Sequence, residues 1–211
     1  MKFKPSYTSS IAEDIMAERL IRAQAVEFLA DAPMRLKSGL ISPVYVDNRK
    51  LFSHPEAWRD IVETMASRVE EYDLEFDIVA GVEAAGSMHA AALAYRLGLP
   101  AIMVRQKAKT YGNHSRIEGG DVKGMRVLLL EDHISTGLSC LDAIRALRGE
   151  GAQVTQVMSI TNYAIPETQR LFKQEGIDTY DVIAFEKVVR KAKEMGVIDD
   201  EHEKLVLEWL Q

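Results

Sequence analysis

The chain has 211 residues, of which 47% are hydrophobic and 27% charged, and its formal net charge is -6 at pH 7. These values are typical of a water-soluble globular protein, and the negative charge argues against general nucleic-acid binding. The single cysteine, Cys140, excludes an intramolecular disulfide and favours a reducing cytoplasm. No targeting signal and no stretch long and apolar enough to cross a bilayer is apparent. We therefore expect a cytoplasmic protein with one domain over residues 1–211.

Strand-like and helix-like patterns alternate along the chain. Residues 8–22 and 54–72 have the hydrophobic spacing of amphipathic helices, and a helical pattern also closes the chain. Strands are expected at 25–29, 44–46, 76–81, 99–104, 127–130, 153–160 and 180–184. This alternation predicts an α/β fold, with a mostly parallel sheet and helices on both faces. Residues 1–50 are expected to form a small hood, and residues 51–211 the core and the C-terminal helices.

The stretch at 127–139 contains the residues that are most informative about function. Four apolar residues lead into two adjacent carboxylates, and a loop with hydroxyls and a glycine then opens a helix. Backbone N–H groups at a helix start bind phosphate, whereas carboxylates suit ribose hydroxyls or a metal ion. The pattern predicts a ribose 5-phosphate pocket, and an ordinary strand end with a helix N-cap is the alternative. The candidate binding residues are Glu131, Asp132, His133, Ile134, Ser135, Thr136, Gly137, Leu138 and Ser139.

This stretch resembles the phosphoribosyl-diphosphate signature of type I phosphoribosyltransferases, although Leu138 stands where a second glycine is usual. In those families the acidic pair contacts the ribose hydroxyls and the next loop wraps the 5-phosphate. The resemblance implies these roles for Glu131, Asp132 and residues 133–139, with Asp132 also catalytic.

A second strand, loop and helix start occur at residues 76–97. The loop between Val82 and His89 is small and glycine-containing, so several of its amides can face an anion. In the resembling families this loop holds the pyrophosphate. We interpret His89 as a buried or capping residue rather than a ligand.

Residues 36–49 narrow the resemblance to the orotate phosphoribosyltransferases. The pattern runs Ser-Gly, two residues, Ser-Pro and then Tyr-x-Asp-x-Arg. In that family the first part faces the base and the pyrophosphate, which implies contacts by Lys37, Ser38 and Gly39.

Two positions that often carry a cation in this family lack one here. Ile41 precedes Ser-Pro, and residues 161–164 lack the Asp-Arg pair that many orotate enzymes place there. Asp47 and Arg49 end the hood pattern, and we interpret them as a structural ion pair.

Three cations, Arg105, Lys107 and Lys109, follow a predicted strand and precede a polar segment at 110–120. A basic loop near a phosphate site predicts a lid that neutralises a pyrophosphate leaving group and excludes water. A solvated basic turn is the alternative.

The same loop resembles the catalytic loop of the orotate enzymes, which runs Arg-x-Lys-x-Lys-x-His-Gly. Tyr111 replaces the histidine, and His114 is a candidate to substitute for it. The resemblance implies catalytic roles for Arg105, Lys109 and Tyr111, and a substrate contact for Lys107. It also implies a homodimer in which residues 105–119 act in the neighbouring subunit.

Taken together, the motifs imply transfer of ribose 5-phosphate from phosphoribosyl diphosphate to orotate, giving orotidine 5-phosphate in pyrimidine nucleotide synthesis. Mg²⁺ is expected with the diphosphate, and Glu131 and Asp132 are its candidate ligands. Two alternatives remain open. One is the same reaction on another base, such as a purine. The other is a non-catalytic regulator that senses phosphoribosyl diphosphate, for which no DNA-binding module is apparent.

Overall fold

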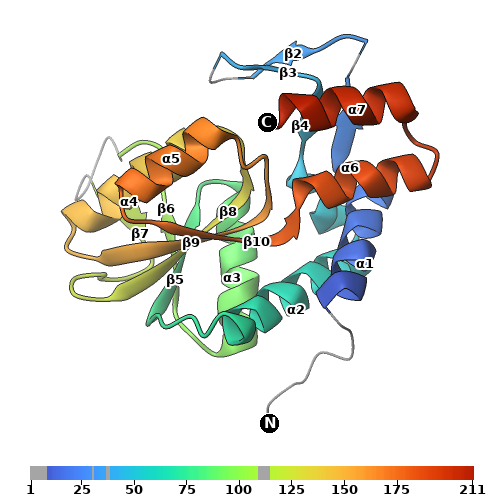
Figure 1. The fold of residues 1–211 in the computed structure, drawn as a ribbon. Helices are drawn as coiled ribbons and strands as arrows, with labels where there is room; N and C mark the ends of the chain where they lie inside the picture. Colours follow the sequence, from blue (N-terminus) through green and yellow to red (C-terminus); the bar gives the residue numbers. More distant parts are fainter. Residues whose placement is uncertain (1–8, 30, 37–38, 109–114) are drawn as a thin grey trace.

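A six-stranded sheet forms the centre of the computed structural model, which describes residues 9–29, 31–36, 39–108 and 115–211 (Figure 1). The strand order is β10-β9-β8-β5-β6-β7, and every pairing is parallel except that of β6 with β7. The strands are β5 (Ile78–Val82), β6 (Ala101–Val104), β7 (Ile117–Glu118), β8 (Arg126–Ile134), β9 (Gln153–Asn162) and β10 (Asp178–Ala184). The predicted mostly parallel sheet is confirmed.

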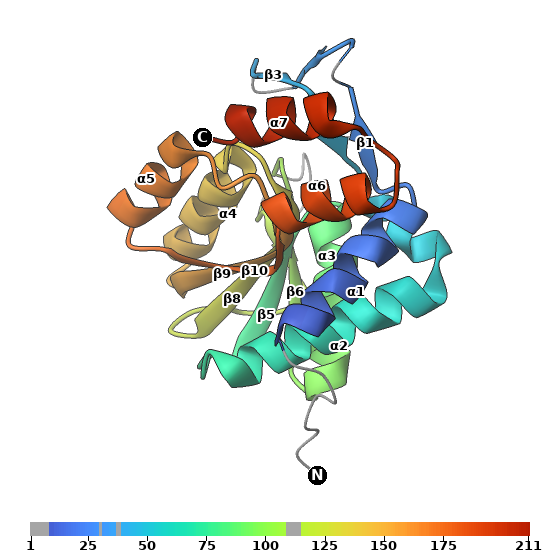
Figure 2. The same cartoon turned by 45° about the vertical axis from the view of Figure 1, so that its right-hand side comes forward.

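Helices cover both faces of this sheet, as Figures 1 and 2 show. On one face α3 (Ala85–Leu97) packs on β5 and β8, with α2 (Pro55–Glu71) against it. On the other face lie α4 (Leu138–Gly149) and α5 (Pro166–Gln174). At the β10 edge, α1 (Ser9–Arg22) packs against α6 (Phe185–Glu194), which is followed by α7 (Asp200–Trp209). In the described ranges, none of these helices has the length and apolar character needed to cross a membrane.

The pattern of β8 explains why both faces are covered. Leu128 and Leu130 belong to the hydrophobic core beneath α3, whereas Val127 and Leu129 belong to the core beneath α4. All four side chains are buried, because successive residues of a strand point to opposite faces. A strand buried on both faces therefore has the continuous apolar run that the sequence contains.

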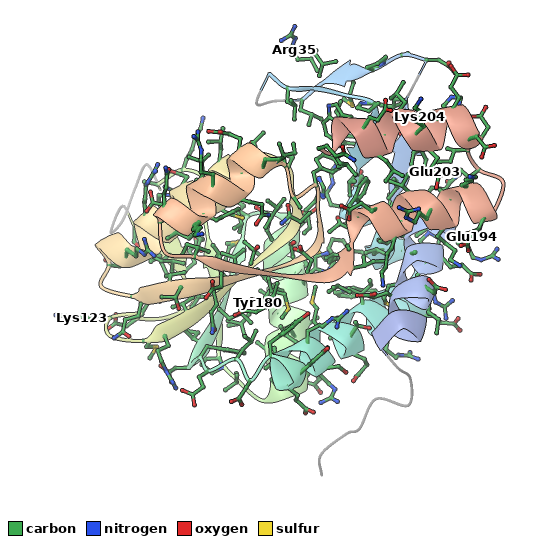
Figure 3. The ribbon with its side chains drawn as sticks, in the orientation of Figure 1. Arg35, Lys123, Tyr180, Glu194, Glu203 and Lys204 are labelled. Atoms are coloured by element: carbon green, nitrogen blue, oxygen red, sulfur yellow. The ribbon has the colours of Figure 1, made fainter. Side chains whose placement is uncertain are left out.

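Small antiparallel strands and a 3-10 helix cover one end of the sheet. They are β1 (Val26–Phe28) paired with β4 (Val44–Val46), β2 (Met34–Arg35) paired with β3 (Ile41–Ser42), and η1 (Asn48–Ser53). Two aromatic residues tie this region to the core: Tyr163 donates to the Val44 carbonyl at 3.0 Å, and Trp209 of α7 donates to the Ile41 carbonyl at 2.9 Å. Arg35 projects from the β2–β3 hairpin away from the rest of the molecule (Figure 3).

The structure differs from the sequence-based expectation in two places. Strand β8 continues through the acidic pair to Ile134, because β9 still pairs with it at His133↔Thr161. Part of the expected polar loop is the short strand β7, paired with β6. The expected C-terminal helices are α6 and α7, divided at residues 195–199.

Candidate active site

A cavity of about 530 Å³ opens at the carboxyl ends of β5, β6 and β8. In open α/β sheets this edge is where ligands bind. One wall comes from the region of β4 and η1, a second from the β5–α3 loop, and a third from the end of β8 and the start of α4. Its lining residues are Leu36, Tyr45, Val46, Asp47, Arg49, Glu83, Ala84, Ala85, Gln106, Glu131, Asp132, His133, Ser135, Thr136, Leu138, Ser139 and Tyr163.

Two helices begin at this cavity without a side-chain cap. The cap residue of α3 is Ala84 and that of α4 is Gly137, and neither helix start is closed by a side-chain hydrogen bond. The first N–H groups of a helix lack partners within it and carry the positive end of its dipole. The hydroxyls of Ser135, Thr136 and Ser139 make no hydrogen bond to other described residues. This edge is therefore equipped to bind more than one phosphate group.

Gly137 explains why the loop can turn so tightly into α4. Its φ is +72°, a conformation that residues with a Cβ rarely adopt. A Cβ here would lie 2.9 Å from the Phe172 ring and 3.1 Å from Thr168 Cγ2. Thr168 in turn donates to the Ser135 carbonyl at 3.2 Å, so α5 supports the loop from behind.

Glu131 lies between the two helix starts. A Cβ on Gly86, at the start of α3, would be 3.3 Å from Glu131 Oε1, and the thiol of Cys140 in α4 is 4.0 Å from Glu131 Oε2. Burial, together with the neighbouring Asp132 carboxylate, raises the pKa of Glu131 well above its usual range. Burial also raises the pKa of the Cys140 thiol, so this cysteine is a packed side chain and not a nucleophile.

Asp132 is positioned through its backbone. Asn48 donates from Nδ2 to the Asp132 carbonyl at 2.6 Å and to Thr161 Oγ1 at 3.1 Å. Burial raises the pKa of Asp132, and the charge of Arg49 opposes that rise. A hydroxyl donor or a cation bound at the two adjacent acids would favour their ionised forms.

His133 and Ile134 belong to the end of strand β8; the His133 side chain lines the cavity, whereas that of Ile134 lies in the core. His133 Nδ1 lies 2.9 Å from Thr161 Oγ1, and its ring packs edge-on against Tyr163 at 4.2 Å. Burial lowers the pKa of His133 to about 3, so the ring is neutral. Ile134 is fully buried. His89 is buried as predicted, and its Nδ1 accepts from Trp58 at 3.1 Å.

The base of the predicted lid is fixed to the site. The Gln106 backbone donates to Glu83 Oε2 at 3.0 Å, and its side chain donates to the Glu83 carbonyl at 3.1 Å. Arg105 pairs with Glu118 at 2.9 Å, across the β6–β7 pairing. Arg105 and Lys107 do not line the cavity of their own chain.

Other predicted site residues lie elsewhere. Gly39 is exposed and does not line the cavity. Lys37, Ser38, Lys109 and Tyr111, with His114, lie outside the residues that the structure describes.

The acidic pair suits Mg²⁺ as far as its donor chemistry goes. Mg²⁺ prefers oxygen ligands and is commonly held by one or two carboxylates together with substrate phosphates. Within the described ranges no group of three or more potential metal-ligating side chains occurs. Glu131 and Asp132 therefore fit a cation that is shared with a bound diphosphate.

Comparison with known proteins identifies the family. The sequence profile described as Phosphoribosyl transferase domain matches residues 47–195. The orotate phosphoribosyltransferase of Coxiella burnetii is 41% identical over 194 residues, which cover 92% of this chain and 93% of that protein. The chain belongs to the orotate phosphoribosyltransferase family. The resemblance read from the sequence motifs is therefore confirmed.

Solved structures agree with this family membership. Leishmania donovani UMP synthase has a TM-score of 0.82 at 27% identity, covering 94% of this chain, which spans 42% of that longer one. Orotate phosphoribosyltransferase from Aeropyrum pernix has a TM-score of 0.73 at 26% identity, covering 87% of this chain and 99% of its own. The expected phosphoribosyltransferase fold is confirmed.

Sequence reasoning missed several residues of the cavity. Tyr45 lines the cavity and Asn48 holds the Asp132 carbonyl, and both lie within the hood pattern, so that motif could have pointed to them. Glu83 and Gln106 gave no such signal, because their contact joins two loops that are distant in sequence.

Proposed function

We propose that this family member transfers the ribose 5-phosphate group of phosphoribosyl diphosphate to orotate, giving orotidine 5-phosphate and pyrophosphate in pyrimidine nucleotide synthesis. One observation carries the proposal: two uncapped helix starts and an acidic pair meet in one cavity. That set of groups matches a ligand with two phosphate ends and a diol between them. The identity shared with the Coxiella burnetii enzyme supports orotate as the base.

Different residues of the site bind different parts of the substrate. The start of α4 and its hydroxyls bind the 5-phosphate, and the start of α3 binds the diphosphate. Glu131 and Asp132 accept hydrogen bonds from the ribose hydroxyls. The bond from the anomeric carbon to the diphosphate oxygen breaks, a bond to the N1 atom of orotate forms, and the proton of N1 is released to solvent. Positive charge develops on the sugar beside the acids, which stabilise it.

Two finer features belong to the proposal. Mg²⁺, when bound, neutralises charge on the diphosphate, and Glu131 and Asp132 would hold it with the diphosphate oxygens. The protein would act as a homodimer in which residues 105–119 reach the neighbouring site, with Arg105 and Lys109 binding the leaving group. The position of Arg105 and Lys107 away from their own cavity supports this arrangement.

The deciding experiment mixes the protein with phosphoribosyl diphosphate, Mg²⁺ and one base at a time. Loss of orotate absorbance, with no product from hypoxanthine, adenine or uracil, is the expected result. Product from a purine alone would overturn the choice of base. Tight binding of phosphoribosyl diphosphate without turnover of any base would favour the sensing role.

The loop is tested by mixing two inactive variants. Lys109→Ala lacks a loop cation, and Asp132→Asn lacks a site acid. If the loop acts on the neighbouring subunit, mixed dimers contain one intact site and regain activity. Continued inactivity of an exchanged mixture would refute the arrangement. Within the loop, His114→Ala is expected to lose more turnover than Tyr111→Phe if His114 substitutes for the family histidine.

A further inference from the structure

The charge of the cavity does not match its anionic substrates. Among its described lining residues, Asp47, Glu83, Glu131 and Asp132 are acidic, whereas Arg49 is the only lysine or arginine. His133 directs its Nδ1 to Thr161 Oγ1, 2.9 Å away. Helix starts and hydroxyls can serve the phosphates, but the carboxylate of orotate still needs a partner. A carboxylate is bound most strongly by a charged donor.

The Arg49 guanidinium makes its hydrogen bonds to described residues through Nε and Nη2 only. Its Nε donates to Asp47 Oδ1 at 2.5 Å, and its Nη2 donates to Asp47 Oδ2 at 2.9 Å. Nη2 also lies 3.4 Å from the Tyr45 hydroxyl. Arginine has five N–H donors, and Nη1 has no partner among the described residues. Asp47 thus fixes the guanidinium and leaves its Nη1 donors for another acceptor.

The position of Arg49 points to the base and not to the phosphates. The helix starts of α3 and α4 form the phosphate walls, whereas Arg49 belongs to the wall from β4 and η1, with its Nη2 3.4 Å from the Tyr45 hydroxyl. Asp132 lines the same cavity and is close enough for its charge to act on Arg49. A ribose bound at Asp132 would therefore carry its base within the cavity that Arg49 lines.

The two sequence positions that often carry a cation in this family do not supply one to this wall. Ile41 is apolar, and its carbonyl is used by Trp209. Tyr163 uses its hydroxyl to bond the Val44 carbonyl. Among the described residues that line the cavity, Arg49 is therefore the cation available to the carboxylate of orotate.

We propose that Arg49, held in place by Asp47, binds the carboxylate of orotate through Nη1 and is the residue that distinguishes orotate from bases without that carboxylate. This inference rests on the proposed function and assigns a specificity role within it. It replaces our interpretation of Asp47 and Arg49 as a purely structural pair: Arg49 contacts substrate and Asp47 positions it.

The test compares two ligands that differ only in this carboxylate. Dissociation constants of orotidine 5-phosphate and uridine 5-phosphate are measured by calorimetry for the wild type and for Arg49→Gln. We expect Arg49→Gln to weaken orotidine 5-phosphate binding roughly 10- to 100-fold, from the loss of a charge-assisted hydrogen bond. Uridine 5-phosphate binding and the KM for phosphoribosyl diphosphate should change less than about two-fold, within the range of near-neutral substitutions. Asp47→Asn should give a smaller loss with the same selectivity.

Arg126→Gln is the matched control, because Arg126 forms a similar exposed two-bond pair with Asp77 at the other end of β8. Equal weakening of both nucleotides by Arg49→Gln, or a raised KM for phosphoribosyl diphosphate alone, would overturn the inference. So would unchanged binding of both nucleotides. Failure of the proposed function can be told apart from failure of this inference, because the proposed function fails only if the wild type does not consume orotate.

Discussion

Asn48 donates a hydrogen bond of 2.6 Å to the backbone carbonyl of Asp132 and so links the η1 helix to the end of the central strand β8. The same amide reaches Thr161 on β9 at 3.1 Å. Asn48 is fully buried. The acidic pair is therefore positioned partly by a residue 84 positions earlier in the chain.

Replacing Asn48 by alanine should loosen the acid pair. Loss of the two bonds leaves the Asp132 carbonyl and the Thr161 hydroxyl without this donor, which costs about 1–3 kcal/mol of unfolding free energy. The KM for phosphoribosyl diphosphate should rise together with this loss, as measured by urea titration and steady-state kinetics. Gln153→Ala, at an exposed amide, is the control. An Asn48→Ala protein with wild-type stability and KM would show that the bond is dispensable.

Glu131→Gln should lower the activity of the protein and raise its stability. The raised pKa of Glu131, caused by burial and by Asp132, means that its ionised form destabilises the free protein above its folded-state pKa. The amide removes that ionisation, so the variant should unfold at a higher temperature than the wild type at pH 8. Turnover should fall roughly 10- to 100-fold with the loss of a charged acceptor. An exposed-site control is Glu150→Gln; a lower melting temperature for Glu131→Gln would contradict the argument.

Asp181 predicts a pH dependence of stability. Burial raises the pKa of Asp181 to about 6 from its ordinary 3.8, although Ser159 donates to it at 2.6 Å. Because the folded-state pKa is the higher one, stability is lost as pH rises from about 4 to about 6. The shift corresponds to roughly 3 kcal/mol. The unfolding free energy of the wild type minus that of Asp181→Asn should therefore fall over this range.

Asp77 is a control for that measurement, because its pKa is shifted in the opposite direction. Its pKa is lowered to about 2 by hydrogen bonds from Arg126, so any stability that it contributes is lost only as pH falls below about 4. The difference between the wild type and Asp77→Asn should stay flat between pH 4 and pH 6. A flat profile for Asp181→Asn as well would contradict the assignment.

Gly137→Ala should disrupt the turn into α4. The positive φ alone costs about 1–2 kcal/mol for a residue with a Cβ, and the clash with Phe172 adds to it. We expect a loss of about 2 kcal/mol or more of unfolding free energy in chemical denaturation, and weaker binding of phosphoribosyl diphosphate. Gly149→Ala, in the same helix, meets no atom within 4 Å and should leave stability unchanged or slightly raised. Equal effects of the two substitutions would show that the turn tolerates a side chain.

The buried strands and the phosphate loops could be predicted from the sequence because their information is local. Leu128 to Leu130 form a continuous apolar run, and Gly137 follows the acids at the spacing that a strand-to-helix turn needs. Local pattern also indicated a buried or capping position for His89, which is buried.

What could not be predicted depends on contacts between distant segments. His133 was expected in a phosphate loop, but pairing of β8 with β9 at Thr161 continues the strand through it. The link from Asn48 to Asp132 and the free Nη1 of Arg49 depend on where η1 docks against β8. No periodicity within either segment encodes that docking.

The bond between Trp209 and Ile41 joins residues 168 positions apart, and it has a consequence for synthesis of the protein. The hairpin that carries Ile41 is synthesised 168 residues before Trp209. Contacts of such long sequence separation form late, because the intervening chain must first be ordered. The β2–β3 hairpin therefore gains its support from α7 only after α7 has been synthesised, and a nascent chain that stops short of α7 would have its phosphate-binding edge without the complete cover above it.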